Sequence, residues 1–415
     1  MSAPAQVSAW DRMVWPEGEL EAWLAGGAHR RELTAWFGEA EYGLLQRLAL
    51  TAAAVEQDPQ RCVYYVPGLM GSQLSLPRAR PLPDNLLWLD PGDVQQGNLS
   101  LLAVPGAKLA VAGPVTYGYL PLKFALQSAG YTVRCFAYDW RLGLAESGVA
   151  LAAQLGAEAA GEIHIVAHSM GGLVARSALR SEAGRRVRRL VTLGTPHGGS
   201  FAPVQAVRGT YPLLRRLAQI DARHDAETLA REVFSGFHSL YQMLPRDHVP
   251  DLVDQRNWPV AGPQPNATLL QRARLLDLGG ADRRIAAIAG HGFQTVDDVT
   301  QAGGEFHYRY SYAGDGTVPL ARAVLSGCPA WYCNVTHGEL TRSAAVHAAV
   351  VALLAGDTPQ LTATAPLQSA RPAGASDTGL REMFAAKLDW TRLDSQQRRA
   401  YMDSLNRAPP AAPAL

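Results

Sequence analysis

The sequence predicts an α/β protein with a mainly parallel sheet, helices on both faces, an inserted cap, and helical extensions at both ends. From residue 62 onward, short β-branched runs alternate with helix-forming segments, which is typical of βαβ crossovers. Between about residues 198 and 283 this alternation gives way to a helical, proline-rich stretch that is too long for a plain connection. These observations predict an α/β domain over residues 59–356, with a cap or lid inserted at about 198–283.

The first segment, residues 1–58, carries apolar residues at helical spacing and is expected to form a helical N-terminal extension. In the α/β domain, strands are expected at residues 63–66, 132–138, 162–167, 187–193, 284–289, 306–312 and 330–335. Helices are expected at residues 122–128, 149–160, 173–179 and 343–354.

The C-terminal part of the chain changes in composition. Residues 357–378 are rich in Pro, Ala, Thr and Ser and are interpreted as a linker. Residues 379–415 are expected to hold a final amphipathic helix, or a pair of helices, followed by a disordered tail.

The bulk properties exclude several classes of function. The chain has 415 residues with a net charge of +1, so nothing in its charge indicates a nucleic-acid partner. The four cysteines, Cys62, Cys135, Cys328 and Cys333, lack metal-ligand spacing and are expected to be reduced thiols. No phosphate-binding loop or dinucleotide fingerprint is present. We therefore predict neither a metal nor a cofactor.

The sequence also bears on location. Its N-terminal residues lack the basic and apolar regions of a secretory signal peptide. No window reaches the ~18 apolar residues of a membrane-spanning helix. The expected location is cytoplasmic, and transient contact with a lipid surface stays open.

The most informative segment lies around Ser169. A β-branched strand leads into Ala167-His-Ser-Met-Gly171, and a helix-forming run follows at once. Strand, small-x-Ser-x-Gly and helix form the sequence pattern of a nucleophile elbow, whose sharp turn needs small flanking residues. The pattern predicts that Ser169 is a nucleophile.

A serine hydroxyl needs a base, and the base needs an orienting carboxylate, in the chain order Ser, acid, His. The expected acid is Asp315, which lies between two glycines directly after the predicted strand 306–312. Asp297 and Asp298 are the rival acids, in a loop of the same interval.

The expected base is His337, which follows the predicted strand 330–335 and precedes a helix. His347 competes with it but lies inside that helix, where a core or surface role fits better. His197 precedes the acid and is interpreted as a residue that shapes the pocket. His168 is interpreted as a packing residue whose ring points away from the partner of Ser169.

An oxyanion formed at the substrate needs preorganised N–H donors. One is the amide after the nucleophile, on Met170. The other is expected in the loop after the first strand, at Leu69, with Met70 as the near alternative.

Together these segments resemble the lecithin:cholesterol acyltransferase family, which includes a lysosomal phospholipase and bacterial relatives. The resemblance rests on segments 66–74, 137–142, 167–171, 193–200, 314–318 and the His337 segment. Within it, Tyr138-Asp-Trp-Arg141 is the most specific element, and its residues alone indicate a strand-end cluster with a buried ion pair. The resemblance implies an α/β-hydrolase core with a cap and a lid, a triad of Ser169, Asp315 and His337, and oxyanion donors at Leu69 and Met170.

The leading hypothesis is a serine hydrolase, of esterase, lipase or phospholipase type, that cleaves small-molecule or lipid esters of apolar acyl groups through an acyl-enzyme. A second hypothesis is an acyltransferase that passes the acyl group to an alcohol. A third is a non-catalytic binding protein on a hydrolase fold.

Overall fold

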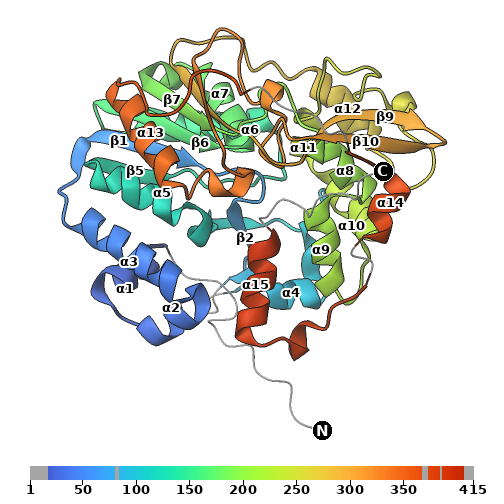
Figure 1. The fold of residues 1–415 in the computed structure, drawn as a ribbon, viewed down its shortest axis with the longest axis horizontal. Helices are drawn as coiled ribbons and strands as arrows, with labels where there is room; N and C mark the ends of the chain where they lie inside the picture. The colour runs from blue at the N-terminus through green and yellow to red at the C-terminus, as the bar shows by residue number, and fades with distance from the viewer. Residues whose placement is uncertain (1–16, 80–83, 367–372, 384–385, 406–415) are drawn as a thin grey trace.

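The computed structural model describes residues 17–79, 84–366, 373–383 and 386–405 (Figure 1). The predicted disordered tail, at residues 408–413, and the first 16 residues of the predicted N-terminal extension lie outside the described residues.

A six-stranded sheet forms the centre of the fold, in the order β11-β8-β7-β6-β1-β5, and every neighbouring pair is parallel. Its strands are β1 (Asp58–Val66), β5 (Tyr131–Cys135), β6 (Glu162–His168), β7 (Val187–Leu193), β8 (Ile285–Gly290) and β11 (Ala330–Cys333). The predicted parallel sheet is therefore confirmed.

Helices cover both faces of this sheet. Successive residues of a strand point to opposite faces, and β6 shows this clearly, since Val166 packs in a cluster with α5 and α13 while Ile165 packs with α6 and α7. These helices are α5 (Thr116–Ser128), α6 (Leu144–Ala157), α7 (Met170–Leu179) and α13 (Ala344–Ala355). Two dry cores thus hold the sheet between helices.

Three helices precede the sheet in the described part of the chain: α1 (Glu17–Gly26), α2 (Arg30–Phe37) and α3 (Glu39–Ala53). Helix α3 packs against α5 (Figure 1), and Lys123 of α5 pairs with Glu21 of α1 at 2.6 Å. The N-terminal helices therefore extend the helical layer that covers the α5 side of the sheet.

A small antiparallel sheet, in the order β3-β2-β4, follows β1. It consists of β2 (Ser72–Leu76), β3 (Asn85–Trp88) and β4 (Ala110–Pro114), with α4 (Pro91–Gln95) and a 3₁₀ helix (Asn98–Leu102) between β3 and β4. The sequence predicts only a loop after the first strand, and no strands, in this region. Strands of four or five residues, next to Pro and Gly, are too short to give a clear alternating pattern.

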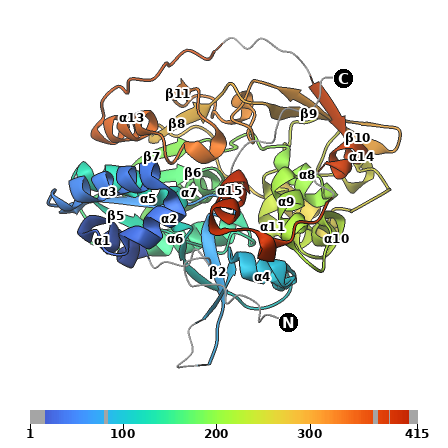
Figure 2. The ribbon, with the colours of Figure 1, turned by 60° about the horizontal axis from the view of Figure 1, so that its bottom comes forward.

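Between β7 and β8 the chain forms a group of short helices that lies beside the main sheet (Figure 2). They are α8 (Ala202–Arg208), α9 (Pro212–Ile220), α10 (Ala226–Glu232), α11 (His238–Gln242) and α12 (Ala267–Arg274). We call this group the cap helices.

A third sheet, in the order β12-β10-β9, is antiparallel. It contains β9 (Thr295–Ala302), β10 (Glu305–Ser311) and β12 (Ala373–Ser376). The strand predicted at 306–312 thus exists as β10, but it stands outside the parallel sheet. Its side chains alternate, with Phe306 and Tyr308 buried and His307 exposed, which is typical of an antiparallel strand with one solvated face.

The predicted linker 357–378 is wrong at its C-terminal end. Residues Ala373–Ser376 form β12, which pairs with β10, and α14 (Asp377–Glu382) begins directly after it. The small side chains of β12 give no alternating apolar pattern, so the sequence does not predict this strand. It forms through backbone hydrogen bonds at a sheet edge, which do not depend on side-chain hydrophobicity.

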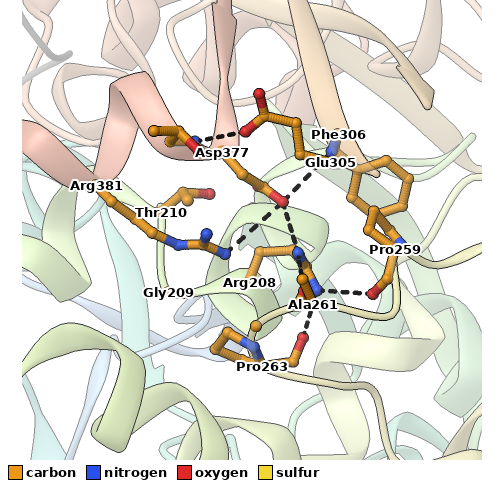
Figure 3. Close-up of polar contacts among 12 residues, drawn as sticks. Arg208, Gly209, Thr210, Pro259, Ala261, Pro263, Glu305, Phe306, Asp377 and Arg381 are labelled. Carbon is orange, nitrogen blue, oxygen red and sulfur yellow. Dashed lines mark hydrogen bonds and ion pairs between the residues drawn. The ribbon is translucent and has the colours of Figure 1, made fainter. Parts of the chain in front are cut away.

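Asp377 anchors this segment to the cap helices through a buried ion pair (Figure 3). The guanidinium of Arg208, on α8, donates to the Asp377 carboxylate at 2.9 Å and 2.8 Å, and both side chains are at most 1% exposed. Tyr308 also donates its hydroxyl to Asp377, at 2.8 Å. The remaining donors of Arg208 reach the backbone carbonyls of Pro259, Ala261 and Pro263, so the pair is fully hydrogen-bonded.

The last described helix is α15 (Ser395–Leu405), which follows a short 3₁₀ turn (Trp390–Arg392). It lies between the N-terminal helix α2 and the cap helix α9 (Figure 1). The segment predicted as one helix or a pair therefore contains two separate helices, α14 and α15.

Candidate active site

Ser169 lies at the sharp turn between β6 and α7, with a positive φ of 53°. Such a backbone is strained for a residue with a side chain, and this strain is common at functional sites. A Cβ at Gly171 would collide with the carbonyl oxygens of Val66 and Pro67, and one at Gly172 would collide with Thr195. A larger residue would therefore not fit at Gly171 or Gly172, as expected for the positions that follow the nucleophile in an elbow.

The structure brings together the three side chains that the sequence singled out. The Ser169 hydroxyl lies 2.8 Å from His337 Nε2, and His337 Nδ1 lies 2.7 Å from Asp315 Oδ2. With Nδ1–H donating to the carboxylate, Nε2 is free to accept the serine proton. The imidazole can therefore act as a general base towards the hydroxyl.

Asp315 reaches this position by a route that the sequence did not predict. The preceding strand, β10, belongs to the antiparallel sheet, not to the parallel one. A Cβ built on Gly290, the last residue of β8, would lie 2.7 Å from the Asp315 Cβ. The carboxylate thus lies beside the C-terminal end of β8, and the β9–β10 hairpin is an insertion between that strand and the acid.

The Asp315 carboxylate is held in place by its own turn. Its other oxygen accepts the amides of Thr317 and Val318 at 2.9 Å and 2.8 Å, and the Asp315 carbonyl accepts the amide of His337 at 2.8 Å. The side chain is 1% exposed. A buried carboxylate with these partners keeps one fixed orientation towards the imidazole.

The rival residues have other partners. Asp297 pairs with Arg309 at 2.9 Å, and Asp298 accepts from His248 at 2.9 Å. His347 is buried and donates to the Thr341 carbonyl at 2.9 Å, as a core histidine would. Neither acid nor the helical histidine takes part in the Ser169 cluster.

The loop after β1 lies directly against the nucleophile. A Cβ on Gly68 would lie 2.8 Å from the Ser169 Cβ, so only glycine allows this approach. The Gly71 amide closes a turn onto the Gly68 carbonyl at 3.0 Å, and Met70 takes a positive φ of 62° within it. Leu69 is therefore beside Ser169, as expected for an oxyanion donor.

Two features support the expected donors. The Met70 carbonyl accepts the indole N–H of Trp88 at 2.8 Å, which fixes the strained turn around Leu69. Met170 is the first residue of α7, where amides have no partner within the helix and carry the positive end of its dipole. Both amides can therefore face a developing negative charge.

His168 was predicted to point away from the partner of Ser169, and this is wrong. Its ring lies 4.8 Å from the ring of His337, and its Nε2 donates to the His337 carbonyl at 3.0 Å. Its Nδ1 lies 3.1 Å from the hydroxyl of Tyr119, which accepts the Gly68 amide at 2.9 Å. We call residues 68–71 the oxyanion loop, after its proposed role. A chain of hydrogen bonds thus joins this loop to the backbone of the candidate base.

Burial keeps this chain neutral. Burial, with a smaller contribution from the nearby His337, lowers the pKa of His168 to about 3, and burial raises the pKa of Tyr119. A neutral ring has one donor and one acceptor nitrogen, which fits its two partners. In the sequence, His168 can be recognised as a site residue because it is next to Ser169. No sequence signal identifies Tyr119, on α5.

The Tyr-Asp-Trp-Arg element supports the same loop. Tyr138 donates its hydroxyl to the Pro67 carbonyl, and Trp140 donates its indole N–H to the Ser72 carbonyl, each at 2.9 Å. Arg141 binds both oxygens of Asp139, at 2.9 Å and 2.7 Å, with side chains 4% and 14% exposed. The predicted buried ion pair is confirmed.

His197 lies outside the cavity lining. It hydrogen-bonds Arg176 at 3.3 Å and Thr192 at 3.1 Å, beneath the elbow helix. Burial, together with the Arg176 charge, lowers its pKa to about 3. The residues of segment 193–200 that line the cavity are Pro196 and Ser200.

A cavity of about 210 Å³ opens onto Ser169 and His337. Its lining is mainly apolar. The apolar lining residues come from the oxyanion loop, the region of the small β2–β4 sheet, the cap, β9 and α15: Leu69, Met70, Trp88, Leu89, Val115, Leu213, Leu240, Met243, Val296 and Leu405. Such a cavity suits an apolar group attached to a polar centre.

The described residues contain no group of three or more His, Cys, Asp or Glu side chains that could hold a metal ion. The four cysteines all lie within the described residues, and none of them forms a disulfide. None of the described helices is long and apolar enough to cross a bilayer.

Comparison with known proteins agrees with this fold. A family model described as a PGAP1-like alpha/beta domain matches residues 151–233, which include the elbow. No curated protein matches the sequence. The resemblance to the lecithin:cholesterol acyltransferase family stays a prediction.

Several solved structures are similar to the chain. The structure of the Tle4–Tli4 complex matches with a TM-score of 0.50 and 12% identity, over 71% of this chain and 98% of that one. The mature Bacillus licheniformis lipase BlEst2 matches with a TM-score of 0.37 and 17% identity, over 72% and 95%. The Vlm2 thioesterase domain matches with a TM-score of 0.24 and 13% identity, over 74% and 98%.

The sheet, the surrounding helices, the PGAP1-like match and the similarity to the Tle4–Tli4 structure define the class of fold. The chain has an α/β-hydrolase-type domain, with a mainly parallel six-stranded sheet and additional helices.

Proposed function

We propose that this protein is a serine hydrolase that cleaves carboxylic esters of apolar acyl groups. The observation that carries the proposal is the hydrogen-bonded series Ser169–His337–Asp315 at the mouth of an apolar cavity. The PGAP1-like match and the lipase and thioesterase among the similar structures agree with an ester substrate.

In the proposed reaction, Ser169 Oγ attacks the ester carbonyl carbon while its proton moves to His337 Nε2. The amides of Leu69 and Met170 stabilise the resulting oxyanion. The C–O bond to the alcohol then breaks, and His337 delivers the proton to the leaving oxygen. Water, activated by the same imidazole, attacks the acyl-enzyme and releases the free acid. Asp315 orients the imidazole and stabilises its charged form.

The test is hydrolysis of p-nitrophenyl esters by the wild type, Ser169→Ala and Asp315→Asn. We expect Ser169→Ala to abolish turnover and labelling by a fluorophosphonate probe. Asp315→Asn should lower kcat about 10⁴-fold, as in comparable triads. Asp297→Asn is the matched control and should retain wild-type rates. Equal turnover by Ser169→Ala and wild type would exclude the proposed mechanism, and unlabelled Ser169 would favour a non-catalytic binding protein.

Acyl transfer is the second candidate, and the enclosed apolar lining contributed by cap residues such as Leu213 and Leu240 favours it. An alcohol that binds this lining would compete with water for the acyl-enzyme. Product analysis with a long-chain alcohol present separates the two reactions. Release of free acid alone would leave hydrolysis as the activity.

A further inference from the structure

One residue of the cavity lining comes from an unexpected part of the chain. The other lining residues lie between positions 69 and 341, whereas Leu405 is the last residue of α15. Its side chain is buried, with 6% exposure. The C-terminal helix, which lies outside the α/β-hydrolase-type domain, therefore contributes to the wall of the candidate active site.

Contacts with the cap hold α15 in this position. The hydroxyl of Tyr401 donates to the Arg216 carbonyl at 2.6 Å and lies 3.0 Å from Gln219 Oε1, and both partners are on α9. In return, the Arg216 guanidinium donates to the carbonyl of Ser404, the residue before Leu405. Since Met402 is also buried on this helix, the end of α15 is fixed by polar and apolar contacts together.

Contacts with the N-terminal helices hold the other side of α15. The Arg399 guanidinium donates to the Trp36 carbonyl and pairs with the Glu41 carboxylate. Glu41 also pairs with Arg342, which donates to the carbonyl of Tyr117 at 3.2 Å. Because Tyr117 is itself a lining residue, these contacts connect α15 to a second part of the cavity lining.

The size of the cavity makes a single lining residue important. Its volume of about 210 Å³ is close to the ~150 Å³ of a protein cavity that holds benzene, and below the ~300–1,000 Å³ of common ligand pockets. A short acyl chain fills such a space. Changing one leucine in the wall therefore changes the accessible length by one or more methylene groups.

We propose that α15 closes the acyl cavity and that Leu405 determines which acyl-chain lengths the protein accepts. This inference rests on the proposed ester hydrolysis. Leu405 acts as a specificity-determining residue, and the two terminal extensions serve to place it.

The experiment compares kcat/KM for p-nitrophenyl butanoate, octanoate and dodecanoate in the wild type, Leu405→Ala and Leu405→Phe. We expect Leu405→Ala to raise the dodecanoate-to-butanoate ratio at least about tenfold, because one methylene group in an apolar pocket changes kcat/KM about 10- to 200-fold. Leu405→Phe should lower the octanoate-to-butanoate ratio. Leu405→Val, which removes less volume, should shift the preference in the same direction as alanine, but less.

The matched control is Leu380→Ala, at a buried leucine of α14 that is not a lining residue. It should keep the wild-type chain-length profile even if it lowers stability. Folded Leu405 variants, as judged by circular dichroism, whose profiles coincide with that of the wild type would overturn the inference.

A binding measurement separates this inference from the proposed function. Isothermal titration calorimetry of Ser169→Ala with octanoate and dodecanoate needs no turnover, and adding Leu405→Ala should selectively strengthen dodecanoate binding. If the wild type hydrolyses no ester but binding shifts in this way, the proposed function fails while the wall assignment holds. If esters are hydrolysed but neither binding nor chain-length profile shifts, the wall assignment fails alone.

Discussion

At the scale of single residues, the hydrogen bonds of Tyr119 and His168 connect two parts of the candidate active site. The oxyanion loop begins at Gly68, whose amide donates to Tyr119, and the proposed base is reached through His168. Tyr119 is buried and His168 is partly buried, so these bonds restrict the loop and the imidazole to one relative position. We assign Tyr119 and His168 as positioning residues.

Tyr119→Phe should therefore lower kcat more than it changes KM. The substitution leaves the Gly68 amide and His168 Nδ1 without their partner, and the Leu69 amide next to them loses its fixed position. Loss of a whole oxyanion donor costs about 10²- to 10³-fold in kcat, and we expect a decrease of at least about tenfold here. Steady-state kinetics with a p-nitrophenyl ester measure the changes in kcat and KM separately.

Tyr312→Phe, at a tyrosine that is 42% exposed, is the control and should behave as the wild type. A rise in KM with unchanged kcat in Tyr119→Phe would contradict a positioning role.

The sequence alone predicted the residues that meet at the site but not those that position them. Ser169, Asp315 and His337 each stand in a local pattern of strand end, glycine and loop, and the structure brings them within hydrogen-bonding distance. Tyr119 precedes the helix predicted at 122–128 and belongs to no element that the sequence predicts, although in the structure it lies on α5. Its contact with His168 depends on how α5 packs on the sheet, and this packing cannot be predicted from a local sequence pattern.

At the scale of elements, β12 and α14 attach the C-terminal segment to the cap and to the third sheet. Asp377 and Arg208 form a pair in which neither side chain is more than 1% exposed. A buried charge is stable only with its partner and its hydrogen bonds. This pair therefore couples the cap helix α8 to the segment that leads to α15.

Asp377→Asn should destabilise the protein by about 3–5 kcal/mol, because it leaves the Arg208 guanidinium buried without a counter-charge. Guanidinium chloride unfolding, followed by tryptophan fluorescence, measures this loss. Asp254→Asn removes an ion pair with Arg256, whose side chain is 89% exposed, and its unfolding midpoint should stay at the wild-type value. Equal midpoints for both variants would contradict the buried role of Asp377.

Elements with strong local signals were predicted well, and elements made by pairing alone were missed. The strand predicted at 187–193 coincides with β7, since its apolar residues are buried in the sheet. Strand β12, with the sequence Ala-Gly-Ala-Ser, has no apolar pattern and exists because β10 offers it a free edge. The strands of the β2–β4 sheet were missed because they contain only four or five residues, which is too short for a clear alternating pattern.

At the scale of the whole molecule, buried neutral histidines make stability depend on pH. Burial lowers the pKa of both His168 and His197 from 6.5 to about 3 in the folded protein. Between these values the unfolded chain binds a proton at each histidine and the folded chain does not. Acidification therefore favours the unfolded state.

The free energy of unfolding should fall with decreasing pH by about 1.4 kcal/mol per pH unit for each of these two histidines. The fall begins near pH 6.5 and ends near pH 3. Denaturant unfolding at about pH 7.5 and about pH 5 measures the slope.

His197→Gln can keep both hydrogen bonds without titrating. For this variant, the slope of the free energy of unfolding against pH should therefore be smaller by about 1.4 kcal/mol per pH unit. His307→Gln, at a side chain that is 45% exposed, should leave the slope unchanged. A wild-type stability that does not fall on acidification would contradict the assignment of buried neutral rings.

The contact between Arg399 and Glu41 joins positions 358 residues apart. The contact therefore closes a loop that contains most of the chain. The entropic cost of closing a loop grows only with the logarithm of its length, by about 0.6 kcal/mol per doubling, so a contact of this span is thermodynamically inexpensive. Contacts of long sequence separation nevertheless form slowly. In refolding, Ser169, His337 and Asp315 should therefore come together before Leu405 reaches the cavity, so that selectivity for acyl length is acquired later than reactivity.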